Sequence, residues 1–127
     1  MIIKQIEIDG RMVPFGASAR TPRLYRQLFQ RDVIKDMASL YSSYQNVLKS
    51  RNVQKLNELE PEAQLSIVDL QVFENLAYVM AKQADPTIPG VDEWLDEFNT
   101  FDIYEILPKL VELWSLNQKG TSIPKKK

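Results

Sequence analysis

Residues 2–15 read Ile-Ile-Lys-Gln-Ile-Glu-Ile-Asp-Gly-Arg-Met-Val-Pro-Phe, and this stretch predicts a β-hairpin. Apolar and polar residues alternate on both sides of Asp9-Gly10, and Asp-Gly is among the strongest short signals for a two-residue hairpin turn. Pro14 has no backbone N–H to donate, so the second strand should be short or lie at an edge. Because an isolated hairpin is marginally stable in water, this one must lie on helices or pair with another chain.

The rest of the chain predicts helices joined by short connections. Residues 16–20 form a linker, and Thr21-Pro22 then marks a helix start, with Thr21 as the N-cap and Pro22 at the first helical position. The polar stretch from Ser50 to Glu60 is expected to be a mobile connection. Helices are predicted over residues 21–49, 61–84, 91–98 and 102–117.

Two details refine these helices. The first is long enough that a break near Val33 is possible, and the last should be capped by Asp102 and kinked or ended in its first half by Pro108. The fold class is therefore mainly α: a short N-terminal β-hairpin over 2–15 followed by a bundle of about four helices. We expect a single domain over residues 1–119 and a disordered basic tail over 120–127.

Apolar residues recur at three- and four-residue steps within the predicted helices, as in amphipathic helices that face a core. In the first helix these residues are Leu24, Leu28, Ile34, Met37, Leu40, Tyr41, Tyr44, Val47 and Leu48. In the second they are Leu65, Val68, Val72, Leu76 and Val79, and in the last Ile103, Ile106, Leu107, Leu110 and Trp114. Trp94 and Trp114 lie within such patterns, so we expect both to pack in the core rather than to stack on a ligand.

Composition excludes several kinds of chemistry. The 127 residues include neither cysteine nor histidine, which rules out disulfides, thiol nucleophiles, and Ser-His-Asp or Cys-His catalysis within this chain. Its four glycines form no phosphate-binding loop. We therefore predict a protein that is not an enzyme and has no catalytic, cofactor-binding or metal site. No signal-peptide pattern opens the sequence, and no apolar run approaches the roughly 20 residues that span a bilayer, so no membrane contact is expected.

Charge is distributed unevenly along the chain. Residues 1–55 carry ten Lys/Arg against four Asp/Glu, a net charge of +6, whereas residues 56–127 carry six against thirteen, a net charge of −7. The two halves form either two solvated faces of one monomer or complementary surfaces that attract further copies. On the second interpretation the chain is a homo-oligomer whose association weakens as salt screens the charges.

A basic run forms the first candidate binding site. It comprises Arg20, Arg23, Arg26 and Arg31, with Tyr25 and Phe29 interleaved. Such a run suits nucleic acid, a carboxylate-bearing protein surface, or solvent alone. An isoelectric point near 5.5 and the lack of a nucleic-acid-binding motif argue against nucleic acid, so we assign these arginines to protein binding.

An acidic cluster forms the second candidate binding site. It comprises Asp92, Glu93, Asp96 and Glu97, paired at four-residue steps on the short helix. Such a cluster can bind Ca²⁺ or Mg²⁺, but it lacks the spacing and central glycine of an EF-hand loop. Acidic residues in the first turn of a helix are also favoured by the helix dipole alone. We assign these four residues to a solvated surface that can bind protein, without a metal.

Four segments, in order, carry a resemblance to a known family. They are ARTPRLYR at 19–26 directly after the hairpin, FENLAYVMAKQADP at 73–86, EWLDEF at 93–98, and YEILP at 104–108 running to LWSLN at 113–117, before the lysine tail. In these segments the chain resembles the tail assembly chaperones of long-tailed phages and of prophages in Gram-positive bacteria. The resemblance covers nearly the whole chain and lies in the order and spacing of the segments, none of which is a catalytic motif.

The resemblance implies a specific role. Such chaperones coat the tape measure protein and recruit tail tube subunits during virion assembly in the bacterial cytoplasm, and they are absent from the finished particle. The family supplies no agreed set of binding residues. The competing interpretations are a nucleic-acid-binding regulator that uses the arginine run, a structural tail-completion protein, and a small enzyme.

The lysine run at the end of the sequence has two interpretations. Lys125, Lys126 and Lys127 form a solvated tail, or the A-rich codons that encode them let the ribosome slip by one base. The resemblance favours slippage, because chaperones of this family are often made in two lengths by ribosomal frameshifting. The 127-residue chain is then the short form.

Overall fold

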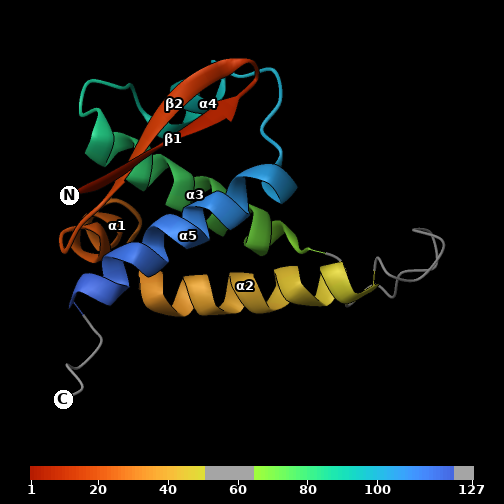
Figure 1. Cartoon of the computed structure of the whole chain (residues 1–127). Coiled ribbons are helices and arrows are strands. Elements are labelled where there is room, and N and C mark those ends of the chain that lie inside the picture. Colours follow the sequence, from red (N-terminus) through yellow and green to blue (C-terminus); the bar gives the residue numbers. More distant parts are fainter. Residues whose placement is uncertain (51–64, 122–127) are drawn as a thin grey trace.

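The computed structural model describes residues 1–50 and 65–121 (Figure 1). Its elements, in order, are β1 (Ile2–Ile8), β2 (Arg11–Ala17), α1 (Thr21–Phe29), α2 (Val33–Ser50), α3 (Ile67–Ala84), α4 (Val91–Leu95) and α5 (Ile103–Thr121). The predicted fold class, mainly α with an N-terminal hairpin, is confirmed. The predicted connection over 50–60 falls almost wholly outside the described residues.

The hairpin closes through the Asp9-Gly10 turn. Both turn residues have positive φ, 56° at Asp9 and 83° at Gly10, as a type I′ turn requires. Ile8 pairs with Arg11 beside this turn, and Gln5 pairs with Pro14 three positions further on. Pairs alternate between hydrogen-bonded and non-hydrogen-bonded along an antiparallel ladder, starting with the hydrogen-bonded Ile8–Arg11 pair. The Gln5–Pro14 pair is therefore non-hydrogen-bonded, and the missing N–H of Pro14 removes no hydrogen bond from the ladder.

The second strand is longer than predicted. It continues to Ala17, so Gly16 and Ala17, predicted as linker, are strand residues opposite Ile3 and Ile2. Both are buried beneath the end of α3. A Cβ on Gly16 would lie 2.6 Å from the Met1 sulfur, so the flexible Met1 side chain would have to move, and 3.4 Å from a backbone nitrogen of α3, which is ordinary van der Waals contact.

The turn offers a simple stability test. Gly10→Ala should lower the free energy of unfolding by about 1 kcal/mol, because alanine is strained at positive φ although no atom lies within 4 Å of the added Cβ. Gly90→Ala is the matched control: its φ is −63°, and only the flexible Glu93 side chain must move. Urea unfolding of both variants measures the difference, and equal losses would contradict a conformational cause.

The long first helix predicted over 21–49 is two helices. Gln30 adopts a left-handed conformation, φ 55°, and donates its backbone N–H to the Arg26 carbonyl at 2.8 Å, which ends α1. Asp32 then accepts the Ile34 backbone N–H at 2.9 Å and starts α2. The possible break near Val33 is therefore confirmed. Thr21 is the first helical residue rather than the N-cap, a position that Arg20 takes.

The remaining helices keep their predicted order but shift their ends. α3 begins at Ile67, after a capping box of Ser66 and Asp69, rather than at residue 61; residues 61–64 lie outside the described ones. α4 ends at Leu95 instead of residue 98. Asp102 accepts the Tyr104 backbone N–H at 2.9 Å, which confirms the predicted cap of α5.

α5 also continues further than predicted. It runs through Pro108 without ending there and extends to Thr121, so residues 120 and 121 are helical rather than part of the tail. Residues 122–127, including the lysine run, lie outside the described part of the chain. Pro108 lacks the N–H that would reach the Tyr104 carbonyl, and the Tyr44 hydroxyl of α2 approaches that carbonyl at 3.5 Å.

The core lies where the inner face of the hairpin meets the helices. α3 is central, since it contacts β2, α1, α2, α4 and α5. The predicted core position Trp94 is confirmed, with 1% of its surface exposed; its ring meets Phe15, Tyr78, Phe98 and Phe101 edge to face at 5.2–6.3 Å. Trp114 is half-buried. In the parts of the chain that are described, no helix has the length and apolar character needed to cross a membrane.

Candidate protein-binding surfaces

Three of the four predicted basic residues are exposed together at α1. Arg20 precedes the helix, and Arg23 and Arg26 follow at three-residue steps. Within residues 1–50 and 65–121, none of these three side chains forms an ion pair. Arg26 also lines a hollow of about 630 Å³ at the corner between α1 and α2. The three guanidinium groups can therefore bind an anionic group of a partner.

Arg31 has a different role from the other arginines. It donates two hydrogen bonds to Asp36, Nε to Oδ2 at 2.7 Å and Nη2 to Oδ1 at 2.9 Å. The buried Tyr25 hydroxyl donates to the same carboxylate at 2.8 Å. The bonds from Arg31, with that from Tyr25, hold the pKa of Asp36 below its ordinary value, and burial raises the pKa of Tyr25 above its own. This cluster joins the end of α1 to α2, so Arg31 stabilises the fold.

The predicted acidic residues are exposed at and after α4. Asp92 and Glu93 lie in its first turn, Asp96 follows the helix, and Glu97 pairs with Arg11 of β2 at 3.0 Å. Among the described residues, no group of three or more Asp and Glu side chains is placed to hold a metal ion. The basic and acidic sets lie on separate helices and no described ion pair joins them. The attraction between the +6 half and the −7 half of separate copies stays a prediction.

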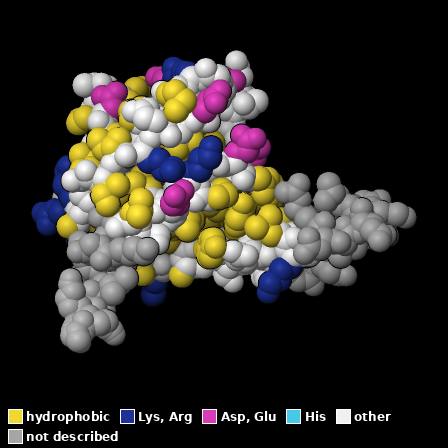
Figure 2. Space-filling model, in the orientation of Figure 1, with side chains coloured by type: hydrophobic (Ala, Val, Ile, Leu, Met, Phe, Trp, Pro, Cys, Tyr) yellow, Lys and Arg dark blue, Asp and Glu magenta, His cyan; other side chains and the backbone are white. Residues whose placement is uncertain are grey.

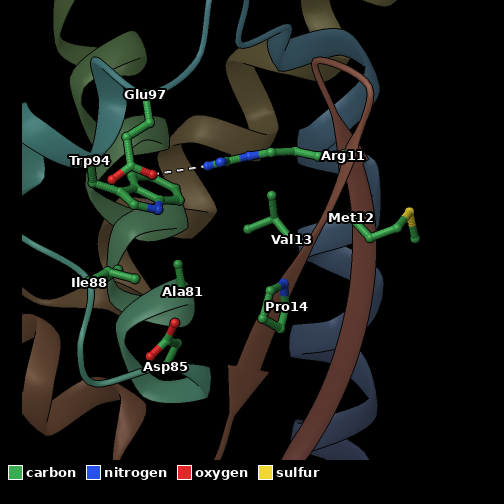
Figure 3. Close-up of a pocket in the computed structure, with 9 residues that line it drawn as sticks. All are labelled: Arg11, Met12, Val13, Pro14, Ala81, Asp85, Ile88, Trp94 and Glu97. Carbon is green, nitrogen blue, oxygen red and sulfur yellow. Dashed lines mark hydrogen bonds and ion pairs between the residues drawn. The ribbon is translucent and has the colours of Figure 1, made fainter.

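A small cleft of about 260 Å³ separates β2 from α3 and α4 (Figure 3). Arg11 reaches across it to Glu97, and its guanidinium carbon lies 4.6 Å from the centre of the Phe98 ring. Met12 points to the opposite side of the strand. At the other end of the cleft, hydrogen bonds from Thr87 hold the pKa of Asp85 below its ordinary value. The Arg11–Glu97 contact thus joins the hairpin to the segment that follows α4, across the cleft.

A second and more apolar hollow lies between α2 and α5. We call it the α2–α5 groove; it has a volume of about 310 Å³ and is lined by Ile34, Met37, Ala38, Tyr41, Val111 and Trp114. Ile34 is 58% exposed and Tyr41 41% exposed. No lining residue carries a charge, so the groove suits an apolar partner surface.

The sequence predictions missed this groove. They placed Ile34, Tyr41 and Leu48 on a core-facing surface, but the structure exposes all three, and it likewise exposes Leu28 and Val68. A signal was present in the sequence: apolar residues fill two adjacent lines along α2. The first line, Val33, Leu40 and Val47, is buried, and the second, Ile34, Tyr41 and Leu48, is not. The two lines together make an apolar stripe on α2 that is wider than the face one neighbouring surface covers, so part of it is exposed.

Comparisons of the chain with protein family models, curated proteins and solved structures found no match.

Proposed function

We propose that this chain is a phage tail assembly chaperone, which binds the tape measure protein, recruits tail tube subunits during virion assembly, and is absent from the finished particle. The observation that carries the proposal is the α2–α5 groove, an apolar surface that residues 1–50 and 65–121 leave open. Exposed apolar surface of this kind is typical of proteins that bind other proteins. The order and spacing of the segments at 19–26, 73–86, 93–98 and 104–117 supply the choice of client.

Three exposed arginines give a place for a second contact. Arg20, Arg23 and Arg26 can bind carboxylates of a client or of a tail tube subunit, and they lie on α1 rather than in the groove. The same arginines are the reason to keep a nucleic-acid-binding regulator as the alternative function, because guanidinium groups also bind phosphates.

The test is co-expression with the tape measure protein encoded in the same genome. We expect this chain to move the tape measure protein from the insoluble to the soluble fraction and to co-purify with it, whereas an unrelated helical domain of similar size should not. DNA binding is measured in parallel at about 150 mM salt, which weakens purely electrostatic contacts. An insoluble client together with micromolar binding to duplex DNA would replace the chaperone by the regulator.

A further inference from the structure

A continuous stripe of uncharged side chains lies along α2. Its members are Ile34, Ala38, Tyr41, Gln45 and Leu48, all exposed except Gln45, which is half-buried. The steps between them alternate four and three residues, which is the spacing of a coiled-coil seam. The stripe covers fourteen residue steps, about 21 Å of helix at 1.5 Å per residue. In the described part of the chain, α5 borders the stripe on one side only.

Aromatic rings join α2 to α5 beside this stripe. Tyr41 stacks on Tyr44 with ring centres 6.3 Å apart, and Tyr44 stacks on Tyr104 of α5 at 5.9 Å. Nearer the start of α2, the groove reaches Val111 and Trp114 of α5. The two helices run in opposite directions (Figure 1), so the early part of α5 faces the late part of α2. The result is an elongated apolar floor, wide enough at one end to hold a side chain.

The two outer rims of the groove differ in charge, since the α2 rim is basic and the α5 rim is mixed. On α2, the exposed Lys35 follows Ile34 and the exposed Lys49 follows Leu48. Both lysines lie on the side of the stripe that faces away from the buried line of Val33, Leu40 and Val47. On α5, Glu105, Lys109 and Glu112 follow Tyr104, Pro108 and Val111 in the same way, away from the buried Ile103 and Leu110, so this rim carries both signs of charge. Glu112 also pairs with Lys4 at 3.3 Å. Figure 2 shows hydrophobic side chains gathered where α5 passes α2, with basic side chains below them and both acidic and basic ones above.

We propose that the α2–α5 groove binds an amphipathic α-helix of the client. The spacing of the stripe on α2 predicts that the client helix has apolar residues at alternating four- and three-residue steps. With this spacing, the side chains of the client helix fit between those of the stripe. The basic rim predicts acidic residues on the flank of that helix that lies over Lys35 and Lys49. This inference rests on the proposed function and specifies the class of client segment that is recognised.

A second copy of the chain matches the groove less well than such a helix. The stripe on α2 of another copy is flanked in sequence only by Lys35 and Lys49. It would therefore bring no acidic residue to the basic rim. The basic rim favours a helix with an acidic flank over such a copy.

The inference is tested with a labelled synthetic peptide of about three heptads, with leucine along the seam, glutamate on one flank and lysine on the other. Fluorescence anisotropy should show binding to the wild-type chain and binding at least about tenfold weaker to Ile34→Lys. Ile3→Lys is the matched control, since Ile3 is 52% exposed on the outer face of β1 and Ile34 is 58% exposed. A peptide with lysine on both flanks should bind less well than the mixed one.

Three further results separate the possible failures. Equal affinity of the mixed peptide for wild type, Ile3→Lys and Ile34→Lys would overturn the groove. A wild-type dimer that Ile34→Lys dissolves, seen by light scattering, would also overturn it, because the occupant would be a second copy. If Ile34→Lys keeps the tape measure protein soluble as well as wild type does, the groove inference fails while the chaperone function stands. If the peptide binds through the groove but the tape measure protein stays insoluble, helix recognition stands and the chaperone function fails.

Discussion

Trp94→Ala is expected to lower the free energy of unfolding by about 3–5 kcal/mol, the largest effect of any single substitution considered. Trp94 is fully buried, and four aromatic rings surround its indole. Alanine would leave a cavity between β2, α3 and α4, because the rings around it cannot all move inward. α4 has only five residues and holds to the core largely through this side chain, so it should detach first.

Urea unfolding followed by circular dichroism measures this loss, since the helical signal does not depend on the removed indole. Trp114→Ala is the matched control, because Trp114 is half-buried beside the α2–α5 groove and its removal leaves a surface that water can fill. We expect that control to lose roughly half as much or less. Similar losses in the two variants would show that Trp94 is not the centre of the core.

Asp36→Ala is expected to lower the free energy of unfolding by about 2–3 kcal/mol. The side chain of Asp36 is 9% exposed and accepts three hydrogen bonds, two from Arg31 and one from the buried Tyr25 hydroxyl. Without the carboxylate, the Tyr25 hydroxyl loses its acceptor inside the protein. Asp92→Ala, which removes an exposed carboxylate from the first turn of α4, should change stability by about 0.5 kcal/mol at most.

The same carboxylate gives stability a dependence on pH. The pKa of Asp36 is lower in the folded chain than its ordinary value near 3.9, so its contribution is present above about pH 4 and is lost as the pH falls through the folded-state pKa. Wild type should therefore lose more stability than Asp36→Ala between about pH 5 and pH 2. Parallel acid unfolding curves of the two proteins would contradict this assignment.

Local sequence signals predicted the elements of the fold. The Asp9-Gly10 turn, the Asp102 cap and the change of period from strand to helix depend on residues close together in the chain, so each was readable without tertiary information. The role of Arg31 was not readable in this way. The sequence analysis grouped it with the other arginines, whereas in the structure it binds Asp36, five residues later. The packing of α1 on α2 buries the Asp36 carboxylate, and Arg31 then binds it. This packing is tertiary structure, which the local sequence does not reveal.

The groove depended even more on tertiary structure. Periodicity identifies which positions of α2 are apolar, but it does not say how many neighbours are available to cover them. Val33 and Ile34 are adjacent and equally apolar, yet one is 1% and the other 58% exposed. The difference arises because α3 and α5 cover one side of α2 and, among the described residues, nothing covers the other.

The hairpin has a consequence for how the chain folds as it is synthesised. Its turn and its first strand contact residues far along the sequence: Asp9 accepts the Asn99 backbone N–H at 2.9 Å, and Lys4 pairs with Glu112 of α5. These two contacts can form only after residues 99–112 have been synthesised. A two-stranded hairpin is too weak to persist alone over that interval. Folding is thus expected to begin among the helices, and the contacts of the hairpin with residues 99–112 are expected to form later, because they join residues that are distant in sequence.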